Sequence, residues 1–200
     1  MTPPDALHPR KTPVQSRSRA SYEAVLTAAA RILEGQGPGA LNTNDVAARA
    51  GVSIGTLYQY FPGKEAIAAE LIRRIKMQLL EDFSEAIVVA RTQNLREAAV
   101  TMVSASIRHH ARAPELSREL ERIEETLPLD AEAVEVGGKV LSALEALLAG
   151  FGIPEPDIAA RDLVSLSKGL VHAALFAGET DLGAIEQRLC RAVFGYLRIP

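Results

Sequence analysis

The chain has 200 residues, of which 48% are hydrophobic and 24% are charged, and its formal net charge is −3. These values favour a soluble globular protein with a buried core, and they exclude a chain that coats nucleic acid over its whole surface. The longest nearly apolar run, residues 140–151, is shorter than the roughly 20 residues of a membrane-spanning helix, so no membrane partner is expected.

The first 17 residues are predicted to form a flexible N-terminal tail. They contain four prolines and scattered charge, without the continuous apolar segment of a secretory signal. We therefore expect the protein to stay in the cytoplasm.

The first predicted helix spans residues 18–35, where apolar side chains recur at i, i+3, i+4 and i+7. The glycine-rich stretch 35–39 contains a proline and predicts a loop after this helix.

Two short helices follow, each with its own capping residue. Asn42 or Thr43 can cap the first of them, and Gly51 is suited to end it. Ser53 can cap the second, which is predicted from residue 54 to about residue 60. Two short helices joined by a glycine turn are typical of a helix-turn-helix.

The rest of the chain is also predicted to be helical, beginning with a long helix over residues 64–90. The later helices are expected at residues 95–111, 114–126, 130–149, 157–177 and 182–198. No run of alternating β-branched residues between turn signals predicts a strand. The fold class is therefore all-α, with the helix-turn-helix in a first domain at 18–78 and a second helical domain at 79–200.

The helix-turn-helix, residues 42–61, has chemistry that suits a DNA groove. Thr43, Tyr58 and Lys64 are interpreted as phosphate contacts, and Gln59 or Thr56 as readers of base edges. The full set of expected DNA-binding residues is Asn42, Thr43, Ser53, Ile54, Gly55, Thr56, Tyr58, Gln59, Tyr60 and Lys64. The structural alternative is a tight helical hairpin that packs well and binds nothing.

The stretch AARAGVSIGTLYQYFPGKEAI resembles the helix-turn-helix of the TetR family, and the resemblance extends over about residues 19–78. It implies that 18–78 is a DNA-binding domain and 79–200 a regulatory and dimerisation domain. The expected protein is a homodimer that binds a pseudo-palindromic operator in double-stranded DNA, usually as a repressor released by a small-molecule inducer. Two features depart from the family pattern. Asn42 stands where Thr or Ser is commoner, and the third helix has no Arg or Lys, so base reading would depend on hydroxyls, Gln59 and DNA shape.

The two parts of the chain carry opposite charge. Residues 1–80 contain ten Lys or Arg against six Asp or Glu, whereas residues 81–200 contain twelve against nineteen. A basic head would be steered toward phosphate, and an acidic body would be kept away from it.

Catalytic and metal sites are not expected. The sequence Gly51-Val52-Ser53-Ile54-Gly55 matches a nucleophile elbow, but a helix precedes it where that motif requires a strand. His109 and His110 are adjacent and point about 100° apart on a helix, so they cannot chelate one ion. No cofactor is indicated. A small all-helical enzyme, or an adaptor that uses the helix-turn-helix as a scaffold, remains the alternative to a DNA-binding regulator.

The last two helices carry more apolar surface than one monomer face requires, which favours a four-helix dimer interface over ordinary core packing. The residues expected there are Leu163, Leu166, Leu170, Ala174, Leu182, Ile185, Leu189 and Val193. A ligand pocket is expected among the middle helices. Its candidate residues are Met102, Ile107, His110, Leu141 and Phe151.

Overall fold

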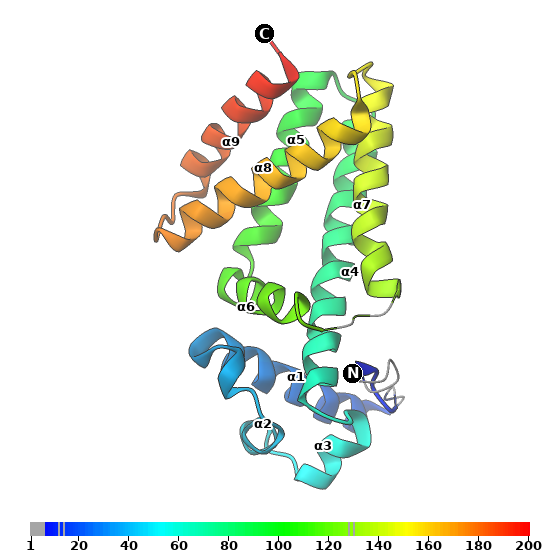
Figure 1. Ribbon diagram of the computed structural model, residues 1–200, viewed down its shortest axis with the longest axis vertical. Coiled ribbons are helices and arrows are strands. Elements are labelled where there is room, and N and C mark those ends of the chain that lie inside the picture. The colour runs from blue at the N-terminus through cyan, green and yellow to red at the C-terminus, as the bar shows by residue number, and fades with distance from the viewer. Residues whose placement is uncertain (1–6, 12, 14, 128, 130) are drawn as a thin grey trace. The chain divides into compact units, whose positions relative to one another are not determined.

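The computed structural model describes residues 7–11, 13, 15–127, 129 and 131–200, and this part of the chain is helical without strands (Figure 1). The chain divides into two compact units. Unit 1 comprises Met1–Ile75 and Glu115–Val134, and unit 2 comprises Lys76–Pro114 and Glu135–Pro200. Among the helices in the described ranges, none is both long and apolar enough to cross a membrane.

Unit 1 contains the helix-turn-helix. Its elements are α1 (Ser16–Gln36), the 3-10 turn η2 (Pro38–Ala40), α2 (Thr43–Ala50), α3 (Ile54–Tyr60), the first half of α4 (Lys64–Ala90) and nearly all of α6 (Pro114–Glu124).

Unit 2 is formed by the remaining helices. Its elements are the second half of α4, α5 (Leu95–Ala111), most of α7 (Ala131–Gly150), α8 (Pro156–Phe176) and α9 (Leu182–Leu197). Helix α5 packs against both α8 and α9, which also contact each other.

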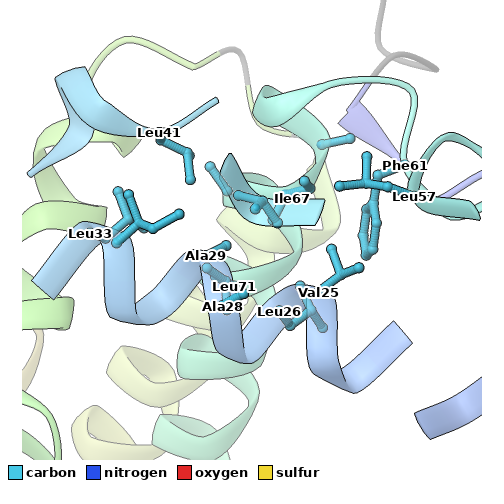
Figure 2. Close-up of a cluster of buried hydrophobic side chains, with 14 of the residues drawn as sticks. Val25, Leu26, Ala28, Ala29, Leu33, Leu41, Leu57, Phe61, Ile67 and Leu71 are labelled. Carbon is cyan, nitrogen blue, oxygen red and sulfur yellow. The ribbon is translucent and has the colours of Figure 1, made fainter. Parts of the chain in front are cut away.

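The core of unit 1 holds the three N-terminal helices and α4 together, and Figure 2 shows its side chains meeting from α1, α3 and α4. The spacing of Val25, Ala29 and Leu33 turns one stripe of α1 inward, and all three are fully buried. Leu57 of α3 and the adjoining Phe61 are fully buried in the same cluster. Burial of a leucine or phenylalanine side chain contributes about 1.5–3 kcal/mol, so these two residues hold α3 firmly on the unit.

Most helix bounds match the sequence-based predictions to within one or two residues. In the glycine-rich stretch, which the sequence predicts to be a loop, α1 ends one residue later than expected, at Gln36, and the 3-10 turn η2 begins at Pro38. A helix can extend until a residue with positive φ ends it, and here that residue is Gly37, at φ 74°. The predicted start of the seventh helix at Asp130 lies outside the described residues.

Part of the predicted flexible tail, residues 1–17, makes specific contacts in unit 1, and α1 already begins at Ser16. Leu7 is buried in unit 1, with 1% of its surface exposed, and Arg73 of α4 donates to the Leu7 carbonyl over 2.8 Å. An apolar side chain and hydrogen bonds to segments far along the chain hold this stretch in place. Residues 1–6, 12 and 14 of the predicted tail lie outside the described residues.

Candidate nucleic-acid interface

The two short helices begin at side-chain caps, as the sequence predicts. Asn42 Oδ1 accepts a hydrogen bond from the backbone of Asp45 over 2.9 Å at the start of α2. Ser53 Oγ accepts one from the backbone of Thr56 over 3.0 Å at the start of α3, and the Ser53 and Thr56 hydroxyls lie 2.8 Å apart. Each cap stabilises its helix by about 1 kcal/mol and fixes where the helix begins.

The turn between α2 and α3 depends on a glycine. Gly51 has a φ of 67° and a ψ of 29°, and its backbone N–H donates to the carbonyls of Ala47 and Ala48. A side chain would strain this left-handed conformation, so glycine sets the direction in which the chain enters α3.

Helix α3 has a buried face and an exposed face. Leu57 is fully buried, whereas Ile54 and Tyr58 each expose 39% of their surface. Gly55 and Gln59 are also exposed, and Thr56 is half-buried. The outer face of α3 therefore presents hydroxyl, amide and apolar groups beside a stretch of bare backbone.

Tyr60 corrects one prediction, because it does not belong to the outer face. It is buried, and its ring meets that of Tyr22 edge-on, with the ring centroids 5.7 Å apart. Tyr60 is three residues after Leu57, so it shares the inward face of α3. Phe61 stacks on the ring of Tyr22, with the two ring centroids 4.8 Å apart.

One hydrogen bond joins the exposed surfaces of α2 and α3. The Thr43 and Tyr58 hydroxyls lie 3.1 Å apart. The structure thus brings together two residues that the sequence analysis interpreted as phosphate contacts. Lys64 is exposed at the start of α4, as a phosphate contact requires.

Sequence reasoning missed that Arg10 lies beside α3. The Arg10 backbone N–H donates to the carbonyl of Tyr60 over 2.7 Å, and its guanidinium donates to the carbonyl of Tyr58 over 3.1 Å. The sequence signal was the basic pair Arg10-Lys11 after a proline. Nothing in that signal indicated which helix the pair would meet.

Most residues predicted at the dimer interface are instead buried inside unit 2, because α8 and α9 pack their apolar stripes against their own core. These residues are Leu163, Ala174, Ile185, Leu189 and Val193, each at most 7% exposed. Leu166 and Leu170 are half-buried and pack against this core, and Leu182 is 40% exposed. Only these three of the eight predicted residues keep surface that a partner can contact.

The five candidate pocket residues all lie in unit 2. Ile107 is buried in the unit 2 core, and Met102, Leu141 and Phe151 are partly buried against it. His110 is half-buried. A ligand site at these residues remains a prediction.

The polar interior of unit 2 is concentrated on α5. His110 Nδ1 lies 3.2 Å from His172 Nε2 of α8, and burial, together with His172, His109 and Lys168, lowers the pKa of His110 to about 3. Burial also lowers the pKa of His109, whose ring is 3.1 Å from Asp82 of α4.

Neither a metal site nor a reactive thiol emerges from the described residues. Among them, no three His, Cys, Asp or Glu side chains are arranged to hold a metal ion. Cys190 is half-buried on α9, where burial raises the pKa of its thiol and leaves it in the less reactive protonated form.

Two segments match known protein families. Residues 25–71 match the bacterial regulatory proteins of the tetR family, and residues 94–197 match the tetracyclin repressor-like C-terminal domain. No curated protein matches the chain.

Several solved structures share the fold. The transcriptional regulator FadR from Bacillus subtilis, in complex with stearoyl-CoA, is 20% identical, with 86% of this chain and 97% of that chain covered and a TM-score of 0.69. A protein with unknown function from Rhodococcus sp. RHA1 is 17% identical, with coverage of 92% and 95% and a TM-score of 0.74. A TetR transcriptional regulator from the same organism is 26% identical, with coverage of 91% and 98% and a TM-score of 0.50.

Proposed function

This chain belongs to the TetR family of bacterial transcriptional regulators, and from that premise we propose that it is a homodimeric repressor. It binds a pseudo-palindromic operator in double-stranded DNA through α3 and leaves that operator when a small-molecule ligand binds unit 2. This function places the protein in the cytoplasm, with DNA.

The observation that carries this proposal is the two-sided character of α3. Leu57, Tyr60 and Phe61 fix the helix to the core, while Gln59 and Tyr58 remain on the outside. Gln59 carries the donor and acceptor pair that suits adenine in the major groove. Because the inner face is rigidly packed, the outer face can meet base edges in one orientation.

Gly55 supports the same assignment. A Cβ at this position would meet only Ser53 Oγ, at 3.8 Å, which is ordinary contact, and Gly55 has no positive φ. Glycine within a helix costs about 1 kcal/mol relative to alanine, so the fold of the subunit gives no reason for it. Close approach of the α3 backbone to DNA does give one.

The dimer we propose uses the outer face of α8. Leu166, Gly169, Ala173 and Phe176 follow one another at spacings of three, four and three residues, and the last three are exposed. Residues at this spacing form a row along the helix, and two helices pack against each other along such rows. Its small residues allow the close approach of a second copy, and the exposed Leu182 on α9 adds to the apolar area.

The ligand site we propose lies along α5. Met102, Ser106 and His110 are spaced at i, i+4 and i+8, so they share one face of that helix. Ser106 is 3% exposed, and within the described residues its hydroxyl has no hydrogen-bond partner. A buried hydroxyl without a partner costs free energy that a bound polar group would recover. Because a FadR of the same fold holds stearoyl-CoA, acyl-CoA thioesters are the first compounds to test.

The proposal is tested by selecting from a random-sequence DNA library with the full-length protein and measuring affinity against salt concentration. We expect a pseudo-palindromic sequence to be enriched and its dissociation constant to rise steeply with salt, because phosphate contacts release counterions. Failure to enrich any sequence, together with salt-independent binding, would contradict the proposed function.

A further inference from the structure

The N-terminal segment Leu7–Lys11, here called the arm, is joined to α3 by two hydrogen bonds. The arm meets the last turn of that helix, where the carbonyls of Tyr58 and Tyr60 accept from the guanidinium and the backbone N–H of Arg10. Figure 1 shows this dark-blue segment beside the end of α3. The arm therefore lies at the C-terminal end of α3.

Two further contacts, both at Leu7, hold the beginning of the arm in position. Leu7 is buried in unit 1, and Arg73 of α4 donates to its carbonyl over 2.8 Å. An apolar anchor at one end and the Arg10 bonds at the other leave the intervening backbone little freedom. A segment held in this way loses little further entropy when it meets a partner.

The arm and the residues that follow it are positively charged, and no acidic residue lies among them in the sequence. From Leu7 to Tyr22 there are four Lys or Arg and no Asp or Glu. Arg10 and Lys11 are exposed, and within the described residues no ion pair involves Lys11. Arg10 uses one guanidinium N–H on Tyr58, and a guanidinium has five such donors.

We propose that the arm is part of the DNA-binding surface, in which Arg10 fixes the arm to α3 and Lys11 binds the phosphate backbone beside the groove that α3 enters. This inference rests on the proposed function. It adds positive charge that α3 itself lacks, since α3 contains no Lys or Arg. Contacts to phosphate fix the register of a protein on the duplex, and the arm would supply such a contact at one end of α3.

The test is the Lys11→Ala variant of the full chain, measured on the duplex that the wild-type protein selects from a random-sequence library. Each phosphate contact contributes about 0.9 to the slope of log affinity against log salt concentration. Loss of one contact in each of two subunits should therefore make the slope shallower by about 2. The matched control is Arg191→Ala, which removes an exposed charge from α9 and should leave the slope unchanged.

A second variant tests whether the arm binds DNA or only stabilises α3. Arg10→Ala removes the bond to Tyr58, and we expect weaker binding with a shallower slope. An unchanged slope for Lys11→Ala would overturn the role of the arm in binding DNA. So would an Arg10→Ala variant that lowers the melting temperature and the affinity but keeps the wild-type slope, because the arm would then only brace α3. A wild-type chain that selects no duplex overturns the proposed function itself.

Discussion

Acid should destabilise unit 2 through His110. This side chain lies against His172, and burial together with nearby His172, His109 and Lys168 lowers the pKa of His110 to about 3. In the unfolded chain a histidine has a pKa of about 6.5. Below pH 6.5 the unfolded chain therefore binds a proton that the folded chain does not bind, and the free energy of unfolding falls.

The magnitude follows from the one proton involved. Well below pH 6.5, each pH unit should lower the free energy of unfolding by about 1.4 kcal/mol. Between pH 6.5 and 4.5 the loss is roughly 2 kcal/mol, because half of the unfolded chains already carry this proton at pH 6.5. His109 adds to this loss, since burial also lowers its pKa. The lowered pKa of Asp82 affects the free energy of unfolding mainly at more acidic pH, because this carboxyl stays largely ionised between pH 6.5 and 4.5. Above about pH 7.5 the contribution of His110 is constant.

The assay is urea unfolding followed by circular dichroism at pH 4.5, 5.5, 6.5 and 7.5, at one protein concentration. The variant His110→Asn keeps a polar side chain opposite His172 and removes the titrating group. We expect the dependence of unfolding free energy on pH to be weaker in this variant by about 1.4 kcal/mol per pH unit between pH 4.5 and 6. Equal pH dependence in the variant and the wild-type protein would refute the linkage.

Three further predictions concern DNA binding and assembly. Gly55→Ala should keep or raise the melting temperature, since Ala favours a helix over Gly by up to about 1 kcal/mol. In a gel-shift assay the same variant should bind the operator more weakly, and unchanged affinity would contradict a close approach of the α3 backbone to DNA. Lys64→Ala should weaken binding to all duplexes alike, whereas Gln59→Ala should change the preference among operators in competition assays; equal losses on every duplex for Gln59→Ala would contradict base reading. Ala173→Glu should give monomers in analytical ultracentrifugation, and Ala146→Glu on the exposed face of α7 should not; a dimeric Ala173→Glu variant would move the interface away from this face of α8.

The helices and the turn could be predicted because their signals are local. Ser53 and Asn42 cap the helices that directly follow them, and Gly51 terminates α2 by its own backbone conformation. These interactions span three or four residues, so the sequence alone contains both partners. The positions of α2 and α3 followed from the same signals.

The misassigned residues have a different cause, because their surroundings are set by distant parts of the chain. Tyr60 is amphipathic, and its place in the core depends on distant residues such as Tyr22, which lies 38 residues earlier. Both α8 and α9 carry apolar residues on more than one face, so periodicity could not show which face meets α5. The contacts of Arg10 with α3 span about 50 residues and left no local pattern.

Chemical interference on the selected operator tests most directly whether α3 enters the major groove. Methylation of guanine N7 modifies the major groove alone, and we expect it to block binding at two clusters of positions, one in each half-site. The clusters should be centred about one helical turn apart, or a multiple of it, as two copies of α3 in a dimer require. Binding that tolerates N7 methylation throughout the operator would contradict the account.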